Sequence, residues 1–142
     1  MKKYKIGYTT GVFDMFHIGH LNILRRAKEL CDYLIVGVST DELVLKDKGK
    51  KTIIPYYDRC QIIESIRYVD EVVPQIDKNK LSAWSRKNFD VMFVGSDWQN
   101  TPQWKEYETQ FRPLGVDIVY LPHTDGISSS ILREKLPPPM LK

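Results

Sequence analysis

The amino-acid sequence predicts an α/β fold: a doubly wound, Rossmann-like parallel sheet of about five strands with helices on both faces. Short apolar runs alternate with helical patterns along the chain. Several of these runs are too continuous for a sheet with one face in water, which implies burial on both sides. Strands that alternate with helices pair in parallel through right-handed crossovers, and ligands bind beyond the carboxyl ends of such strands.

Each expected element has a local signal. The apolar runs predict strands at residues 4–8, 33–38, 71–73, 91–94 and 116–121. Helical patterns between them predict helices at residues 18–30, 56–68, 80–87 and 103–111, with a last one at 129–136. Pro55 and Pro102 fit the first turn of a helix, where the missing N–H costs nothing. No Gly-x-Gly-x-x-Gly fingerprint is present, so a dinucleotide-type loop is not expected.

Length, charge and cysteine content limit the class of protein. The 142 residues predict one domain over residues 1–136 and a proline-rich tail at 137–142. The formal net charge of +3 is too small and dispersed for a nucleic-acid partner. No apolar run approaches the roughly 20 residues that span a bilayer, so membrane insertion is not expected. Cys31 and Cys60 lack disulfide-scaffold spacing, which favours a cytoplasmic location.

The most informative segment is Gly-Val-Phe-Asp-Met-Phe-His-Ile-Gly-His at residues 11–20, directly behind the first expected strand. His17 and His20 are three residues apart and share one face of the helix that starts there. A helix start offers free N–H groups and the positive end of the dipole, so this face favours anions. Gly19 lacks a Cβ and lets a ligand approach the backbone between the rings. The segment therefore predicts a phosphate site.

Two other interpretations of the histidine pair remain open. A histidine on an apolar face is often a satisfied core residue, and a pair at this spacing can chelate a metal. The sequence supplies no third ligand nearby and no His-Glu-x-x-His arrangement, which makes zinc the weaker interpretation. No protein-held metal is expected.

Two motifs together point to a family. Residues 17–20 resemble the His-x-Gly-His signature of the nucleotidyltransferase superfamily. Residues 120–130, Tyr-Leu-Pro-His-Thr-Asp-Gly-Ile-Ser-Ser-Ser, resemble the Arg-Thr-Glu-Gly-Ile-Ser-Thr-Thr signature of its cytidylyltransferase branch. The similarity runs from about Lys5 to Glu134 and is to the small bacterial glycerol-3-phosphate cytidylyltransferases. The chain departs from that group at Val12, where relatives have Thr, and at His123, where relatives have Arg.

The resemblance implies transfer of CMP from CTP to a phosphorylated alcohol, with glycerol 3-phosphate as the expected acceptor, and release of pyrophosphate. In such a displacement the protein mainly positions two polyanions and neutralises developing charge. The resemblance also implies Mg²⁺ carried by the nucleotide, with Mn²⁺ as a substitute, and a homodimer. Retained turnover in excess chelator would contradict the expectation of a divalent ion.

The same resemblance assigns roles to individual residues. The histidines contact phosphate and stabilise the transition state, the lysines and arginines meet phosphates, and the strand-end and serine motifs hold the nucleotide. The residues expected to act in catalysis are His17, His20, Lys48, Arg59 and Arg67, and those expected to bind the acceptor are Lys48, Lys50 and Arg67. The residues expected to bind the nucleotide are Gly11, Val12, Phe13, Asp14, Gly19, Asp97, Trp98, His123, Thr124, Gly126, Ile127, Ser128 and Ser129.

Several of these residues also have a structural interpretation. Asp14 can orient its loop through Asx-type hydrogen bonds, and the run of lysines can be solvated surface. Arg67 can pair with Asp70 or Glu71, and Trp98 can pack in the core. His123 replaces a permanent cation with one that titrates near neutrality, so we expect nucleotide binding there to take up a proton.

Other functions remain open at this point. An adenylyltransferase that uses ATP shares the histidine signature. Ethanolamine phosphate or choline phosphate can replace glycerol phosphate, with Tyr56, Tyr57, Trp98 or Trp104 contacting the cationic head group. A nucleotide-binding regulator without turnover is the non-catalytic alternative, although sensing alone does not require so many cations directed at phosphate.

Overall fold

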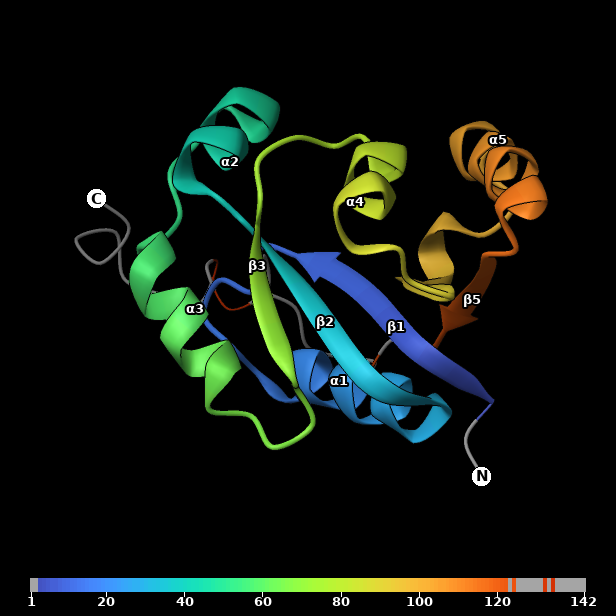
Figure 1. The fold of residues 1–142 in the computed structure, drawn as a ribbon. Helices are drawn as coiled ribbons and strands as arrows, with labels where there is room; N and C mark the ends of the chain where they lie inside the picture. Colours follow the sequence, from blue (N-terminus) through green and yellow to red (C-terminus); the bar gives the residue numbers. More distant parts are fainter. Residues whose placement is uncertain (1–2, 123, 125–131, 133, 135–142) are drawn as a thin grey trace.

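Five parallel strands form one sheet in the order β3-β2-β1-β4-β5 (Figure 1). The computed structural model describes residues 3–122, 124, 132 and 134. The strands are β1 (Tyr4–Gly11), β2 (Cys31–Ser39), β3 (Glu71–Gln75), β4 (Val91–Gly95) and β5 (Asp117–Leu121). From β1 the chain moves outward to β2 and then β3. It then crosses back to form β4 on the other side of β1, followed by β5, so the strand order changes direction at β1. The prediction of a doubly wound parallel sheet is confirmed.

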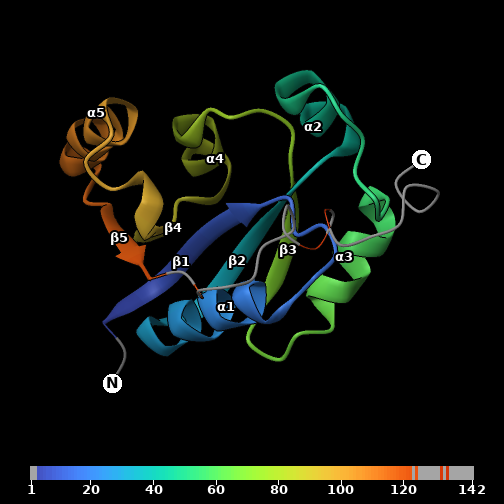
Figure 2. The same ribbon diagram turned by 180° about the vertical axis from the view of Figure 1, so that it is seen from behind.

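Helices cover both faces of this sheet. They are α1 (Ile18–Leu30), α2 (Asp41–Lys48), α3 (Tyr56–Glu64), α4 (Lys80–Lys87) and α5 (Pro102–Phe111), with short 3₁₀ turns at Ser96–Trp98 and Arg112–Leu114. Helices α1 and α3 lie against one face, and α4 and α5 lie against the other, as the opposite views of Figures 1 and 2 show. No helix in the described part of the chain is long and apolar enough to cross a membrane.

Alternate strand residues fill two separate cores. Leu34 and Val36 of β2 pack on the side of α1 and α3, whereas Ile35 between them packs on the side of α4 and α5. On β4, Phe93 joins the first core and Met92 joins the second. Burial on both faces explains why the strands read as continuous apolar runs.

Most elements match the sequence-based expectation, and helix α3 is shorter than expected. The bounds of α1 and α4 agree with it, and Pro102 occupies the first turn of α5. Helix α3 ends at Glu64 rather than residue 68, because the chain turns into β3 and the Asp70 carboxylate accepts the N–H of Leu34 at 2.8 Å. Most of the expected helix at 129–136 lies outside the described residues.

Helix α2 is an element that the sequence analysis missed. Its N-cap is Thr40, whose hydroxyl accepts the N–H of Leu43 at 3.1 Å. Gly49 ends the helix with a φ of 69°, a left-handed conformation that favours glycine. Both signals are readable from sequence, but the lysines at residues 46–51 were considered only as phosphate contacts or solvated surface, and no helix was expected there. Lys48 therefore projects from the last turn of a helix.

Candidate active site

A cavity of about 420 Å³ lies at the carboxyl ends of the strands, where the fold predicts a ligand. One wall carries His20 and Ile23 from α1, and the opposite wall carries Lys80 from α4 and Tyr107 from α5. Six of the predicted site residues line this cavity: Gly11, Val12, Phe13, His20, Lys48 and Trp98.

The two histidines form a reciprocal cap at the start of α1. His17 is the N-cap residue, and its Nδ1 accepts the backbone N–H of Gly19 at 3.0 Å. The backbone N–H of His17 donates in turn to Nδ1 of His20 at 3.2 Å. The rings stack with their centroids 3.8 Å apart. The spacing of the two histidines therefore also fixes their orientation, as in a capping box.

This cap determines which ring nitrogen carries the proton. In both rings Nδ1 accepts a backbone hydrogen bond, so a neutral imidazole must carry its proton on Nε2. Nε2 of His17 is buried and has no hydrogen-bond partner among the described residues. The Nε2–H of His17 is therefore a donor that the described residues leave for a ligand.

Burial keeps both rings neutral. Desolvation, and after it the neighbouring His17, lower the pKa of His20 to about 3. Desolvation also lowers the pKa of His17. Phe13 contacts the His20 ring edge-on with centroids 5.3 Å apart, and Phe16 contacts it at 5.4 Å. The pair is therefore a set of neutral donors at a helix N-terminus, which suits a phosphate with developing negative charge.

The loop between β1 and α1 is conformationally strained. Phe13 has a φ of 56° and Met15 a φ of 51°, and side chains larger than glycine rarely adopt this left-handed region. Such strain persists only where surrounding contacts hold it.

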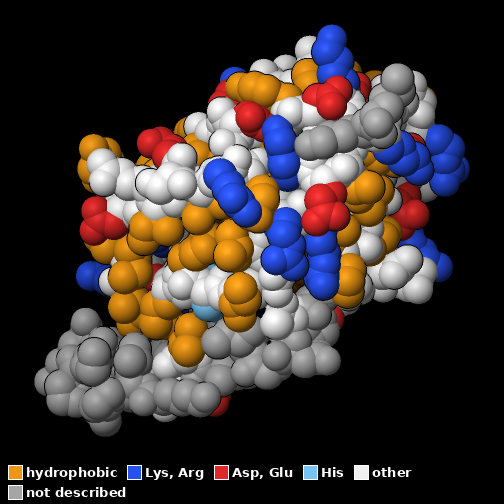
Figure 3. Space-filling model, turned by 90° about the horizontal axis from the view of Figure 1, so that it is seen from below, with side chains coloured by type: hydrophobic (Ala, Val, Ile, Leu, Met, Phe, Trp, Pro, Cys, Tyr) orange, Lys and Arg blue, Asp and Glu red, His pale blue; other side chains and the backbone are white. Residues whose placement is uncertain are grey.

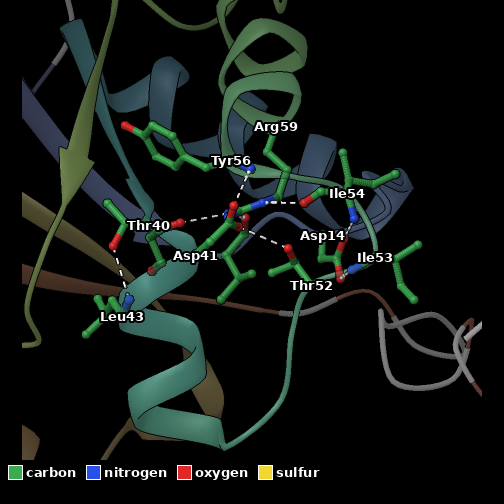
Figure 4. Close-up of polar contacts among 11 residues, drawn as sticks. Asp14, Thr40, Asp41, Leu43, Thr52, Ile53, Ile54, Tyr56 and Arg59 are labelled. Atoms are coloured by element: carbon green, nitrogen blue, oxygen red, sulfur yellow. Dashed lines mark hydrogen bonds and ion pairs between the residues drawn. The ribbon is translucent and has the colours of Figure 1, made fainter. Parts of the chain in front are cut away.

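Asp14 supplies one of these contacts. Its side chain is buried, and its two carboxylate oxygens accept the backbone N–H groups of Ile53 and Ile54, each at 2.8 Å (Figure 4). The carboxylate thus binds the segment between α2 and α3 to the histidine loop. This geometry favours the orienting role considered for Asp14.

Arg59 holds the same region together from α3. Its side chain is fully buried, and Nη1 donates to the carbonyls of Val12 at 2.7 Å and Ser39 at 2.8 Å. Nε donates to the carbonyl of Ile54 at 2.9 Å, and Nη2 pairs with Asp41 at 2.6 Å (Figure 4). The sequence predicted contact with phosphate, whereas this geometry commits the guanidinium to the protein. Arg59 is a positioning residue for the ends of β1 and β2.

Asp41 extends the network to the lysine-rich segment. It accepts the hydroxyl of Thr52 and the backbone N–H of Tyr56, both at 3.1 Å. Burial opposes ionisation, but these bonds and Arg59 outweigh it and hold the pKa of Asp41 below its usual value. The segment of residues 49–55 is thus anchored at its C-terminal end.

The predicted lysines lie in different settings. Lys48, the last residue of α2, lines the cavity, whereas Lys50 is exposed in the following segment and lies outside the lining. Lys48 can therefore contact a polyanion bound in the cavity, whereas Lys50 is not part of the cavity wall.

Arg67 lies far from the histidines. It precedes β3, at the edge where the parallel strands begin, and its Nη2 donates to the hydroxyl of Tyr68 at 3.1 Å. With Arg25 and Lys28 it lines a separate open hollow beside α1. Figure 3 views the molecule from below and shows Lys and Arg side chains gathered around an acidic side chain, with a histidine set apart among hydrophobic side chains. This placement is contrary to the predicted role of Arg67 at the phosphate site, because that site lies at the opposite edge of the sheet.

The strand-end motif and the second signature reach the site in part. Trp98 is 53% exposed and lines the cavity, so it does not pack in the core. Asp97 is exposed in the same 3₁₀ turn. Thr124 accepts a hydrogen bond from Asn22 of α1 at 2.8 Å, which brings the second signature beside the first. The predicted residues His123, Gly126, Ile127, Ser128 and Ser129 lie outside the described residues.

Sequence reasoning missed several polar residues in the cavity wall, among them Lys80 and Gln75. Lys80 opens α4 and Gln75 ends β3. Their position at a strand end and at the helix start that follows was a usable signal, because ligands bind at such edges. Among the described residues, no group of three or more His, Cys, Asp or Glu side chains is arranged to hold a metal ion.

The fold and the site together define a parallel α/β protein with an anion site at the start of its first helix. A model of the cytidylyltransferase-like family matches residues 8–135. The chain is 42% identical over 135 residues to glycerol-3-phosphate cytidylyltransferase of Bacillus subtilis strain 168, covering 90% of this chain and 94% of that protein.

Two further comparisons agree with this. Identity to FAD synthase of Pyrococcus abyssi strain GE5 / Orsay is 38% over 114 residues, covering 80% of this chain and 77% of that protein. The lipopolysaccharide core biosynthesis protein of Thermoplasma volcanium has a TM-score of 0.70 at 25% identity, covering 85% of this chain and 97% of that one. The chain belongs to the cytidylyltransferase-like family.

Proposed function

We propose that this protein is a CTP-dependent cytidylyltransferase that transfers CMP to a phosphorylated alcohol, glycerol 3-phosphate, and releases pyrophosphate. The observation that carries the proposal is the histidine pair, in which the described residues leave the Nε2–H of His17 for a ligand at the start of α1. The identity to glycerol-3-phosphate cytidylyltransferase over most of the chain supports the choice of substrates.

The reaction is an in-line displacement at phosphorus. An oxygen of the acceptor phosphate forms a bond to the α-phosphorus of CTP, the bond from that phosphorus to the bridging oxygen breaks, and the pair of electrons leaves with pyrophosphate. The Nε2–H donors of His17 and His20 and the N-terminus of α1 stabilise the charge that develops on the phosphate oxygens. Lys48 contributes a cation from the end of α2.

A divalent ion belongs to the substrate in this proposal. The described residues supply no cluster of metal ligands, so Mg²⁺ arrives on the phosphates of CTP, and Mn²⁺ can replace it. We also propose that His123, Gly126, Ile127, Ser128 and Ser129 contact the nucleotide, and that the enzyme works as a cytoplasmic homodimer. Light scattering coupled to size-exclusion chromatography tests the oligomeric state.

Pyrophosphate release tests the function directly. The purified protein is offered each nucleoside triphosphate with glycerol 3-phosphate, ethanolamine phosphate or choline phosphate, with and without excess chelator. The proposal predicts release with CTP and glycerol 3-phosphate, and none with chelator. Faster turnover with ATP than with CTP, or with a cationic acceptor than with glycerol 3-phosphate, would show that the proposed substrates are wrong.

A further inference from the structure

Two polar side chains of α1 bind the chain where it leaves β5. Nδ2 of Asn22 donates to the hydroxyl of Thr124 at 2.8 Å, and Nη1 of Arg26 donates to the carbonyl of Pro122 at 3.0 Å. Asn22 and Arg26 are four residues apart, so they lie on one face of the helix. Both acceptors belong to the second signature at residues 120–130. Helix α1 therefore carries the histidine motif at its start and two contacts to the second signature further along.

These two contacts lie just beyond the end of the sheet. The ladder between β4 and β5 ends with the pair Gly95 and Leu121. Leu121 is buried in the core that α1 shares with the sheet, so packing fixes β5 up to this residue. Pro122 is exposed and, as a proline, has no N–H to donate. The path of the chain beyond Leu121 therefore depends on the side chains that bond to it, and Asn22 and Arg26 are two of these.

The bond from Asn22 also orients the hydroxyl of Thr124. A threonine hydroxyl has one hydrogen to donate and two lone pairs that accept. Asn22 donates to a lone pair of this oxygen, so the bond does not use the hydroxyl hydrogen. An oxygen of a bound phosphate can accept that hydrogen, and the sequence predicts that Thr124 binds the nucleotide. The contact with Asn22 therefore leaves Thr124 able to donate to an anion.

Asn22 and Arg26 act on the cavity from outside its wall. The described lining takes His20 and Ile23 from α1, and Asn22 and Arg26 lie outside that lining. Asn22 follows His20 by two residues, about 3 Å along the helix axis. The helix therefore sets the spacing between the histidine donors and Thr124. A misplacement of about 1 Å in such a group can cost on the order of 10²-fold in rate.

We propose that Asn22 and Arg26 are positioning residues of the active site, which hold Thr124 against the triphosphate at a fixed spacing from the histidine pair. This inference rests on the proposed function and adds to it two residues that act through the second signature. Their effect falls on the nucleotide, so binding of the acceptor is expected to be unchanged when they are replaced.

A double-mutant cycle on nucleotide binding tests the contact of Asn22. An α,β-methylene analogue of CTP, which cannot release pyrophosphate, is titrated calorimetrically with Mg²⁺ into the wild type, Asn22→Ala, Thr124→Val and the double variant. Asn22→Ala should weaken binding by about 3- to 10-fold, the range of one hydrogen bond. The double variant should bind no more weakly than Thr124→Val, because Asn22 acts through that hydroxyl. Losses that multiply, or unchanged binding by Asn22→Ala, overturn the inference.

Arg26 is tested by rescue with lysine. Arg26→Met removes the donor to Pro122 and should raise the KM for CTP by about 3- to 10-fold, with the KM for the acceptor within about two-fold of wild type. Arg26→Lys keeps a donor and should recover most of the loss. Arg25→Met is the matched control and should match the wild type, since Arg25 is the adjacent arginine and pairs with Glu29 at 3.9 Å. A rise in both KM values together with a lower midpoint of thermal unfolding would show a structural role only and overturn the inference.

The proposed function and this inference fail in different ways. If the wild type binds the CTP analogue but releases no pyrophosphate with any acceptor, the proposed function is refuted, and the binding cycle still decides the role of Asn22. If the wild type does not bind the analogue, the inference is overturned. Turnover with unchanged nucleotide affinity in both Asn22→Ala and Arg26→Met refutes the inference alone.

Discussion

Arg59 is a fully buried cation and Lys80 is a partly buried one, and they lie on opposite sides of the sheet in opposite surroundings. Arg59 donates to three backbone carbonyls and one carboxylate from neighbouring segments. Lys80 has one long contact, to Thr10. A buried cation whose donors are all used stabilises the fold, whereas one whose donors are unused lowers stability until a ligand arrives. Burial alone therefore does not show whether a cation stabilises the fold, and the count of its partners is the better guide.

The largest expected effect tests this contrast through stability. Arg59→Met removes a guanidinium and leaves the carbonyls of Val12, Ser39 and Ile54 without their donors, so we expect the free energy of unfolding to fall by about 3 kcal/mol or more. Lys80→Met removes a partly buried charge that has no ion-pair partner among the described residues, and it should leave stability unchanged or higher. Urea unfolding of both variants measures the difference. Equal destabilisation by the two substitutions would contradict the comparison.

The next effect concerns chemistry on the wall of α1. His17→Asn and His20→Ala should each lower kcat by about 10²-fold, because the Nε2–H donors act mainly on the transition state. Asn at position 17 can still cap α1, so this variant separates catalysis from the cap. Circular dichroism checks the fold, and pyrophosphate release gives the rate. Near-normal turnover in both variants would remove the histidines from the mechanism.

The sequence predicts the fold well because its signals are local. Continuous apolar runs specified the buried parallel strands, and the spacing of His17 and His20 specified a helix start. The contacts of Arg59 could not be predicted from the sequence. Val12, Ser39 and Ile54 accept its hydrogen bonds through backbone carbonyls, which are the same in every residue type. The lack of partners at Lys80 is equally invisible in a chain with 21 Lys and Arg residues, since only the tertiary structure buries this one.

The low pKa of His20 also predicts that the stability of the fold depends on pH. The His20 side chain takes up a proton near pH 6.5 when unfolded but only near about 3 when folded. Between these values the unfolded state binds more protons, so this group lowers the free energy of unfolding as pH falls from 6.5 toward 3. The slope from His20 is at most about 1.4 kcal/mol per pH unit. Urea unfolding between pH 7 and 4 should show a shallower decline for His20→Gln than for the wild type, with parallel curves as the contrary result.

The smallest expected effect is at the lysines of α2 and the segment after it. Lys48 lines the cavity and faces the bound polyanions from the end of α2, so Lys48→Ala should raise the KM for CTP or for the acceptor several-fold, on the order of 3- to 10-fold. Lys50 is exposed outside the lining, and a solvent-screened charge contributes little. Lys50→Ala should therefore have a smaller effect than Lys48→Ala. Lys46→Ala, exposed on the same helix and outside the cavity, serves as the control and should match the wild type. If all three variants behave alike, the lysines of this segment are solvated surface, and the cations that bind substrate must come from elsewhere in the cavity.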